Sequence, residues 1–184
     1  MRLGVTGTPG VGKTTFSVEL AGRLGLETIH LDDMLVEEGL FRGRDWRREA
    51  YIVDMDRFSS WIRGRVVSPG VYEGLSIIYN EDSEMFDKVI VLRCDPYTLE
   101  ERLLRRGYSR EKVAENLEAE ILDIVYAEAV DIYGEEKVIQ IDNSGSLDVA
   151  VDRAIHKIVS GGECDIVDWL ELIMSRGDVR RFLE

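Results

Sequence analysis

Residues Gly7–Thr14 form a glycine-rich segment that matches the pattern G-x-x-x-x-G-K-[ST]. The segment directly follows an apolar run at Leu3–Thr6, which predicts a strand, and opens a helical pattern over Lys13–Leu24. Glycines here let successive backbone N–H groups point into one concavity, and the positive end of the helix dipole adds attraction for anions. The pattern therefore predicts a loop that binds the phosphates of a nucleoside triphosphate. The alternative, a glycine-rich turn without a ligand, does not require this strand and helix.

The side chains at the end of this loop indicate how the phosphates would be held. We expect Lys13 to reach the β- and γ-phosphates and the Thr14 hydroxyl to coordinate a bridging Mg²⁺. Thr15 would donate on the side of the α-phosphate. Binding, hydrolysis and transfer of the terminal phosphate all use such a cradle, so residues outside the loop must decide among these outcomes.

Basic residues gather in two other segments, which together hold nine of the 23 Lys and Arg in a chain with 36 Asp and Glu. Transfer of phosphate to a small acceptor needs arginines on a flap that clamps the acceptor. It also needs arginines on a lid that neutralises the transferring group and excludes water. The alternative is that both clusters are ordinary solvated helix faces. The clusters are Arg42, Arg44, Arg47 and Arg48, and Arg102, Arg105, Arg106, Arg110 and Lys112.

Carboxylates complete the candidate site. Asp33 follows the second predicted strand at its carboxyl end, where open α/β sheets bind ligands, so it could orient an acceptor or a metal-bound water. Asp32 competes for that role. Glu73 ends the third predicted strand, where an acidic residue could hold Mg²⁺ through water. The alternative reading makes these residues helix caps or surface charges, and Asp54 and Asp56 are weaker candidates still because they precede a helix.

The elements that must position these residues alternate between strand and helix, which predicts βαβ units. We expect a three-layer P-loop NTPase fold, in which helices flank a mostly parallel five-stranded sheet. Asp95 and Ser109 are expected helix caps, the second opening one long helix. The predicted strands are Leu3–Thr6, Glu27–Leu31, Gly70–Glu73, Lys88–Arg93 and Lys137–Ile141, and the predicted helices run over 13–24, 96–107, 110–133 and 146–159.

Two segments break this alternation. Residues 33–64 are longer than a bare connection needs, and we interpret them as an inserted helical flap for the substrate. The last 25 residues begin with a break at Ser160-Gly161-Gly162 and then place Ile166, Trp169, Leu170 and Ile173 in an apolar stripe. This pattern predicts a terminal helix that docks on the body of the domain, with a partner-binding helix as the alternative.

Length, charge and composition limit the functional class. The chain of 184 residues is the size of one domain, and its net charge of −13 argues against broad binding to nucleic acid or anionic membrane. Cys94 and Cys164 are too few for a disulfide framework, so we expect a reducing cytoplasm. His30 and His156 are isolated and are expected to be structural. We expect neither a signal sequence nor a membrane span.

Beyond the phosphate loop, the chain resembles the broad-specificity nucleoside-monophosphate kinases of the adenylate kinase isoenzyme six type over roughly residues 1–145. Eukaryotic members of that family also act in late maturation of the small ribosomal subunit. The Arg-Gly-Tyr at 106–108, followed by Glu-Asn and Ala-Glu-Ile, is the most specific match. Matching segments are 6–15, Asp33, 37–41, 52–57, 91–93, 101–103, 106–108, 115–116, 119–121 and 128–129.

The resemblance implies a reaction and a set of site residues. The reaction is reversible transfer of the terminal phosphate of ATP to AMP or a related monophosphate, with Mg²⁺ and with a weaker ATPase activity. Residues 1–160 would form the kinase domain, with a monophosphate-binding flap at about 30–64 and a lid at about 105–115, and residues 161–184 a helical extension. The ATP-binding residues that the resemblance implies are Gly10, Gly12, Lys13, Thr14, Thr15 and Arg106. Together with the residues singled out above, the candidate catalytic residues are Lys13, Arg106 and Asp33, and the candidate metal ligands are Thr14 and Glu73.

One position departs from the family pattern. Family members usually carry a histidine two residues after the acidic end of the third strand, and here Leu75 stands at that position. ATPase activity and its coupling to ribosome maturation could therefore be altered while phosphoryl transfer is kept. Two alternatives stay open: an ATPase assembly factor that acts on small-subunit ribosomal protein eleven, and a kinase for another small metabolite.

Overall fold

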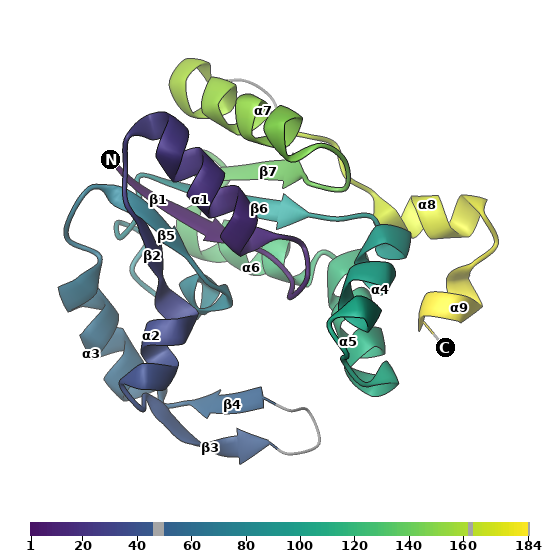
Figure 1. Cartoon of the computed structure of the whole chain (residues 1–184), viewed down its shortest axis with the longest axis horizontal. Helices are drawn as coiled ribbons and strands as arrows, with labels where there is room; N and C mark the ends of the chain where they lie inside the picture. Colours follow the sequence, from purple (N-terminus) through teal and green to yellow (C-terminus); the bar gives the residue numbers. More distant parts are fainter. Residues whose placement is uncertain (46–49, 162–163, 184) are drawn as a thin grey trace.

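The sheet at the centre of the molecule is parallel throughout. Our computed structural model describes residues 1–45, 50–161 and 164–183. Five strands lie in the order β2-β5-β1-β6-β7, and each neighbouring pair is parallel (Figure 1). The expected sheet is therefore confirmed. The strands are β1 (Arg2–Thr6), β2 (Thr28–His30), β5 (Gly70–Glu73), β6 (Lys88–Arg93) and β7 (Val138–Asp142).

Helices cover both faces of this sheet and make a three-layer sandwich. Helices α1 and α7 pack together on one face, while α6 and the 3-10 helix η1 lie on the other (Figure 1). Side chains alternate along β6: Ile90 and Leu92 enter the core under α1, and Val89 and Val91 enter the core under α6. The flanking elements are α1 (Lys13–Leu24), α6 (Ile124–Tyr133), α7 (Leu147–Ser160) and η1 (Leu75–Tyr79).

The predicted helix caps are formed. The Asp95 side chain accepts hydrogen bonds from the backbone N–H groups of Tyr97 and Thr98, both at 3.1 Å. The Ser109 hydroxyl accepts one from the backbone N–H of Lys112 at 3.3 Å. These bonds satisfy donors that would otherwise be unpaired in the first turn of each helix. The capped helices are α4 (Pro96–Arg105) and α5 (Arg110–Ile121).

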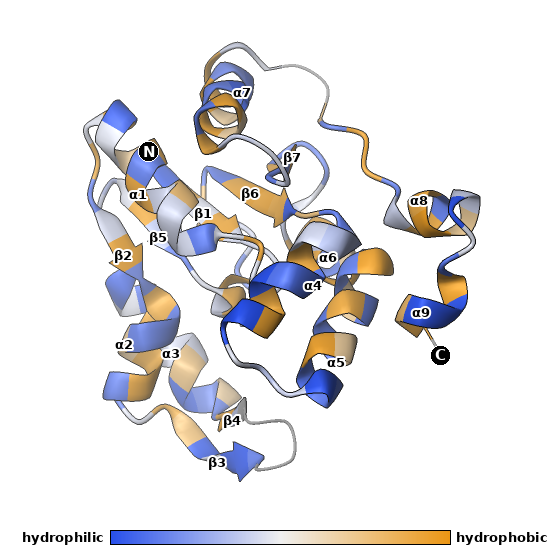
Figure 2. Ribbon diagram, turned by 45° about the vertical axis from the view of Figure 1, so that its right-hand side comes forward, coloured by the Kyte–Doolittle hydropathy of each residue, from blue (hydrophilic) through white to orange (hydrophobic). Residues whose placement is uncertain are grey.

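Helix α4 places its two kinds of side chain on different sides. Leu99 and Leu103 are fully buried in the core beside α1. The side chain of Arg105 is 69% exposed. Figure 2 shows the resulting mixture of hydrophobic and hydrophilic residues along this helix. The apolar side fixes α4 against the domain, so the arginines near its C-terminus are held over the phosphate loop.

The prediction of one long helix over residues 110–133 is wrong. The chain turns between α5 and α6 at Asp123, which adopts a left-handed conformation with φ of 58°. The buried Arg93 side chain explains this break. It donates to the backbone carbonyl of Glu120 at 2.7 Å and to the Asp123 carboxylate. A carbonyl near the end of α5 therefore has a hydrogen-bond donor from outside the helix.

The insertion at 33–64 was expected to be helical, but it also contains an antiparallel hairpin. Strand β3 carries Phe41, whose ring lies 4.6 Å from that of Tyr51 on β4. This cross-strand aromatic pair stabilises the hairpin. The expected residues Arg47 and Arg48 lie outside the described residues. The elements of the insertion are α2 (Leu31–Glu37), β3 (Phe41–Asp45), β4 (Ala50–Val53) and α3 (Met55–Arg65).

The C-terminal segment forms two short helices, α8 (Trp169–Ser175) and α9 (Val179–Leu183), where one was expected. They pack against α5, as predicted for a docked terminus (Figure 1). Ile173 and Phe182 join the core shared by α1, α4 and α5. Ile166 and Leu170 are 96% and 38% exposed and do not belong to the buried side, so only Trp169 and Ile173 of the predicted apolar stripe are buried. No helix within the described residues is long and apolar enough to cross a membrane.

Candidate active site

The phosphate loop connects β1 to α1 and depends on glycine at defined positions. Gly10 and Gly12 have φ of 97° and 103°, a region that other residues rarely adopt. A Cβ atom at Gly10 would lie 2.8 Å from side-chain carbons of Leu99 and Leu103, and one at Gly12 would lie 2.8 Å from the Asn143 amide nitrogen. The loop therefore passes too close to α4 and to the end of β7 for any side chain at these positions.

Lys13 lies across this loop. Its ammonium donates to the carbonyl oxygen of Gly7 at 2.8 Å and more weakly to that of Thr8 at 3.5 Å. Burial lowers the pKa of the Lys13 ammonium from its ordinary value, and the nearby carboxylates of Asp32 and Glu73 oppose that shift. An incoming phosphate would act in the same direction as these carboxylates, so phosphate binding favours the charged form of Lys13.

Thr14 and Glu73 come together at the carboxyl end of the sheet. The Thr14 hydroxyl donates to Oε1 of Glu73 at 3.2 Å, and the same oxygen lies 2.7 Å from Nδ1 of His30. Strand pairing explains this arrangement, since β2 and β5 are neighbours and His30 is in register with Glu73. Hydroxyl and carboxylate oxygens are the donors that Mg²⁺ prefers, so this pair fits the expected metal site.

The two adjacent aspartates at the start of α2 have different surroundings. Both carboxylate oxygens of Asp32 accept backbone N–H groups, from Leu75 at 2.8 Å and from Ser76 at 3.0 Å. Asp32 therefore caps η1 from another part of the chain. Asp33 is exposed and lines the same pocket as Lys13, Glu73 and Leu75. Of the two candidates for a role toward the substrate, Asp33 is the one whose carboxylate is not already used in this way.

This first pocket, which we call the α2 pocket, lies between the phosphate loop and α2. Its lining combines the loop, the carboxylates at the strand ends and the segment after α4. The lining residues are Pro9, Gly10, Gly12, Lys13, Thr14, Asp32, Asp33, Glu73, Leu75, Arg106 and Tyr108.

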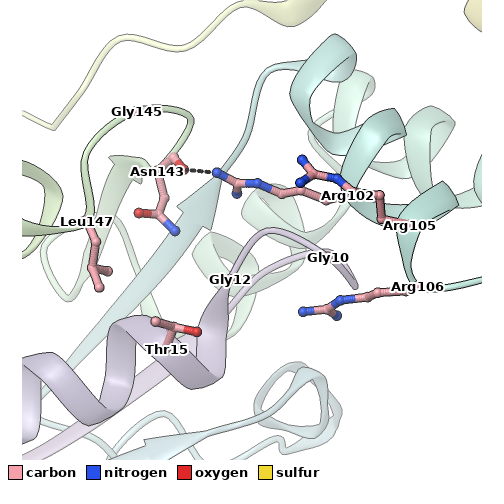
Figure 3. A pocket seen from close by; sticks show the side chains of 9 residues that line it. All are labelled: Gly10, Gly12, Thr15, Arg102, Arg105, Arg106, Asn143, Gly145 and Leu147. Atoms are coloured by element: carbon pink, nitrogen blue, oxygen red, sulfur yellow. Dashed lines mark hydrogen bonds between the residues drawn. The ribbon is translucent and has the colours of Figure 1, made fainter.

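A second pocket, which we call the α4 pocket, lies on the other side of the loop and has a volume of about 440 Å³ (Figure 3). Figure 3 shows three arginines of the α4 end projecting toward the loop. Arg102 donates to the carbonyl oxygens of Val11 at 3.2 Å and Asn143 at 3.1 Å. The lining residues are Gly10, Gly12, Thr15, Arg102, Arg105, Arg106, Asn143, Gly145 and Leu147.

The structure divides the arginine clusters that the sequence grouped together. Arg106 lines both pockets, whereas Arg110 lines a different hollow beside α9. Lys112 lies over the ring of Tyr108, with its ammonium 4.9 Å from the ring centre. Only the part of the second cluster at the end of α4 therefore surrounds the phosphate loop.

The arginines of the insertion have other neighbours. Arg42 donates to the carboxylates of Asp54 at 3.2 Å and Asp56 at 2.9 Å. Arg44 lies 5.7 Å from the ring centre of Tyr51. The Asp54 side chain also accepts from the backbone N–H of Arg57 and caps α3, so the capping alternative for that aspartate is confirmed. None of these side chains lines the α2 or the α4 pocket.

Sequence reasoning missed two residues of the site. His30 was expected to be isolated, but it contacts Glu73. Asn143 follows β7 directly, lines the α4 pocket, and donates from its amide to the carbonyl oxygen of Val11 at 2.8 Å. Their positions carried a signal, because each stands at the carboxyl end of a parallel strand, where ligands of such sheets bind.

The parallel sheet, with a phosphate loop between β1 and α1, defines a P-loop fold. Solved structures with the same fold include shikimate kinase from Bacteroides thetaiotaomicron, with a TM-score of 0.60, 16% identity, and coverage of 87% of this chain and 98% of the other. Shikimate kinase from Acinetobacter baumannii in complex with shikimate has a TM-score of 0.63, 17% identity, and coverage of 86% and 93%. These likenesses establish the fold.

Sequence comparison gives the family. Residues 3–123 match the family described as AAA domain. A protein of Natronomonas pharaonis named "Putative adenylate kinase" is 41% identical over 161 residues, which cover 88% of this chain and 91% of the relative. A protein of Thermococcus gammatolerans with the same name is 38% identical, with 94% of each chain covered. The chain belongs to the same family of P-loop kinases as these two relatives and is a phosphotransferase.

Proposed function

We propose that this protein is a nucleoside-monophosphate kinase that transfers the terminal phosphate of ATP to AMP or a related monophosphate. One observation carries the proposal: two separate pockets meet at one phosphate loop and share Gly10, Gly12 and Arg106. A protein that only hydrolyses ATP needs one nucleotide pocket beside this loop. Two pockets suit a donor and an acceptor whose phosphates meet between them.

Each pocket has the chemistry for one substrate. The α4 pocket combines arginines with the uncharged Asn143, Gly145 and Leu147, which suits the base and sugar of ATP. The α2 pocket would hold the acceptor, with the exposed Asp33 positioned to orient it. Arg106 lines both, so its guanidinium would lie where charge develops on the phosphate in transfer. Lys13 would hold the β- and γ-phosphates beside it.

Mg²⁺ would be held by the Thr14 hydroxyl and, through water, by the Glu73 carboxylate. When bound, the metal would neutralise negative charge on the phosphates. His30 contributes by orienting the Glu73 carboxylate from the neighbouring strand. Thr15 lies in the first turn of α1 and lines the α4 pocket, which suits a contact with the α-phosphate.

The proposal assigns a role to each part of the chain. Residues 1–160 would be the kinase domain, in which about 30–64 act as the flap over the acceptor and about 105–115 as the lid. Residues 161–184 would be a C-terminal extension.

A cytoplasmic location also belongs to the proposal, supported by the free thiols of Cys94 and Cys164.

The decisive experiment is ATP turnover with and without AMP, CMP, GMP and UMP, with products separated by chromatography and a Lys13→Ala control. Formation of a diphosphate from a monophosphate, lost in Lys13→Ala, is the expected result. ATP consumption that no monophosphate stimulates would contradict the kinase. A kinase for another metabolite would then be tested with sugar acids, because a solved gluconokinase shares this fold.

A second candidate function is an ATPase that acts on ribosomal protein eleven during maturation of the small ribosomal subunit. Its support is the family resemblance together with the net charge of −13, which would accelerate association with a basic protein. Leu75, in place of the family histidine, lines the α2 pocket beside Glu73. We expect slow basal hydrolysis of ATP and, if this role holds, a change in that rate on adding the basic protein.

A further inference from the structure

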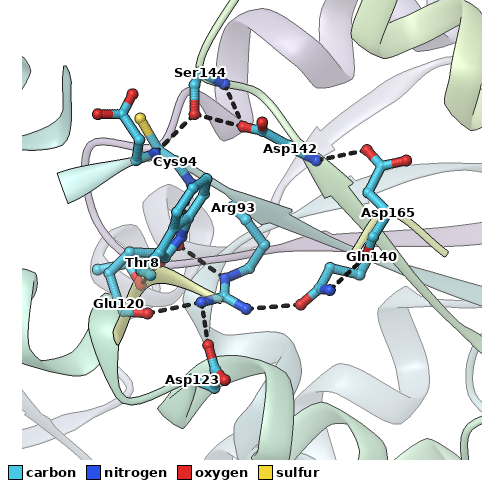
Figure 4. A network of polar contacts seen from close by, with 11 residues as sticks. Thr8, Arg93, Cys94, Glu120, Asp123, Gln140, Asp142, Ser144 and Asp165 are labelled. Carbon is cyan, nitrogen blue, oxygen red and sulfur yellow. Dashed lines mark hydrogen bonds and ion pairs between the residues drawn. The ribbon is translucent and has the colours of Figure 1, made fainter. Parts of the chain in front are cut away.

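The carboxylate of Glu120 is a buried junction between three distant parts of the chain (Figure 4). Glu120 lies on α5 and is 2% exposed. It accepts four hydrogen bonds, one from the phosphate loop, two from the end of β6 and one from α8. The donors are the Thr8 hydroxyl at 2.5 Å, Nε of Arg93 at 2.8 Å, the backbone N–H of Cys94 at 3.0 Å and Nε1 of Trp169 at 3.1 Å.

The bond to Thr8 acts on the phosphate loop itself. Thr8 is 1% exposed, and its hydroxyl donates to Oε2 of Glu120. The carbonyl oxygen of the same residue accepts from the backbone N–H of Val11 at 3.3 Å and from Nζ of Lys13 at 3.5 Å. A shift of Thr8 would therefore move both the backbone of the loop and the ammonium group that is expected to hold the phosphates.

The geometry of Glu120 is fixed by charge as well as by hydrogen bonds. Arg93 pairs with it, and both side chains are almost fully buried, at 2% and 1% exposed. The Arg93 guanidinium also donates to the side chains of Gln140 at 2.7 Å and Asp123. A buried ion pair whose partners are all satisfied resists rearrangement, because any other rotamer would leave charge and donors unpaired.

The C-terminal segment supplies part of this junction. Trp169 donates its indole N–H to Oε1 of Glu120, and its side chain packs in the main core. The neighbouring Asp165 accepts from the Gln140 amide through its backbone carbonyl at 2.7 Å. Arg93, which pairs with Glu120, donates to the same Gln140. The segment beyond α7 thus contacts the hydrogen-bond network that ends on the phosphate loop.

We propose that Glu120 is a positioning residue for the phosphate loop and that Trp169 of the C-terminal segment completes its orientation. The segment beyond α7 is thereby part of the ATP-binding apparatus. This inference rests on the proposed function only in taking ATP as the nucleotide that the loop binds. It makes no assumption about the acceptor.

The first test is the Trp169→Phe variant, which removes the indole donor and keeps an aromatic ring. Its matched control is Tyr97→Phe. This variant removes another hydrogen bond to the C-terminal segment, from the Tyr97 hydroxyl on α4 to Asp178 at 2.6 Å, and this bond does not involve Glu120. Affinity for Mg²⁺-ATP is measured by calorimetry, alongside kcat and KM. We expect Trp169→Phe to weaken binding of Mg²⁺-ATP about tenfold in calorimetry, and to lower kcat/KM for ATP by a similar factor while KM for the acceptor stays unchanged.

Tyr97→Phe should lower the melting temperature without changing affinity for ATP. Equal losses of ATP affinity in both variants, or no loss in Trp169→Phe, would overturn the proposal. The first result would mean that the segment acts only through stability.

A second pair of variants tests the other end of the junction. Thr8→Val removes the hydroxyl that donates to Glu120, and Thr8→Ser keeps a hydroxyl there. We expect ATP affinity to be clearly lower in Thr8→Val than in Thr8→Ser, and equal affinities would contradict the role of Glu120. These binding experiments need no acceptor. If no monophosphate is phosphorylated, the proposed function fails while the contrast in ATP affinity still decides this inference.

Discussion

The Nδ1 atom of His30 lies 2.7 Å from Oε1 of Glu73, the same oxygen that accepts a hydrogen bond from the Thr14 hydroxyl. The carboxylate is 10% exposed, whereas the imidazole is 35% exposed. Glu73 is thus held between the first turn of α1 and the end of β2. An imidazole from the neighbouring strand borders the expected metal site, whereas the position two residues beyond Glu73 is the apolar Leu75.

We expect removal of this contact to weaken the response to Mg²⁺. In His30→Leu, the Glu73 carboxylate loses one of the groups that orient it, so the Mg²⁺ concentration for half-maximal phosphoryl transfer should rise about tenfold. His30→Asn places an amide nitrogen near the position of Nδ1 and should restore most of the response. The measurement is a Mg²⁺ titration of the transfer rate at saturating ATP. Identical curves for the two variants would mean that the contact between His30 and Glu73 does not affect the response to Mg²⁺.

Asp32 and Asp33 should separate into a stability residue and an activity residue. Asp32→Asn leaves one of the N–H groups of Leu75 and Ser76 facing an amide NH₂, so the free energy of unfolding should fall by about 1–3 kcal/mol. Asp33→Asn should leave that free energy unchanged and lower kcat about 100-fold. Urea denaturation and steady-state kinetics on both variants provide the check. A loss of activity without loss of stability in Asp32→Asn would reverse the assignment.

Arg106 should affect transfer more than binding. Because it lines both pockets, Arg106→Ala should lower kcat about 100-fold while KM for ATP changes less. Arg105 is the comparison, since it lines only the α4 pocket and pairs on the surface with Glu101 at 3.1 Å. Arg105→Ala should cause a smaller loss in kcat. Equal effects on kcat would mean that general positive charge, and not the position of Arg106, is what matters.

The fold should lose stability in alkali because of a buried thiol. Burial raises the pKa of Cys94 from 9.0 to about 12 in the folded chain. The unfolded chain therefore releases this proton first, and the free energy of unfolding should fall as the pH rises from about 9 towards 12. The slope from this one group is about 1.4 kcal/mol per pH unit. Urea denaturation between pH 8 and about 11 measures it.

The Cys94→Ala variant should show a shallower decline over this range, although its stability at neutral pH will also differ because a buried side chain is shortened. The slope, and not the absolute value, is therefore compared. Cys164→Ala is the control for a thiol that is only partly buried. Part of the decline should remain in Cys94→Ala, since burial also raises the pKa of Tyr133 from 10.0 to about 12. A slope unaltered by Cys94→Ala would contradict the prediction.

The features that the sequence predicted well depend on local patterns. The phosphate loop, the caps at Asp95 and Ser109 and the end of α1 at Leu24 are each specified by residues a few positions apart. The five strands were likewise predictable, because buried parallel strands appear as short apolar runs. These signals together gave the class of fold and the location of the nucleotide site.

What the sequence did not predict depends on contacts between distant residues. The break at Asp123 is stabilised by Arg93, which lies 30 positions earlier. Strand β3 has no apolar alternation, since its sequence Phe-Arg-Gly-Arg-Asp is mainly polar. The contact of His30 with Glu73 requires β2 to lie beside β5, and the order of strands in a sheet cannot be obtained from apolar runs alone.

The order of the sheet also affects how the chain is made. Strand β1 is synthesised before the other four strands of the sheet but occupies the centre, where it pairs with β5 from Gly70 onward and with β6 from Lys88 onward. At a synthesis rate of about 5–20 residues per second, β1 waits roughly 4–17 s for its second neighbour. Throughout that interval an apolar strand has at least one open edge, a template for pairing with other chains. Of the five strands in the sheet, β1 therefore stays longest without its full set of partners.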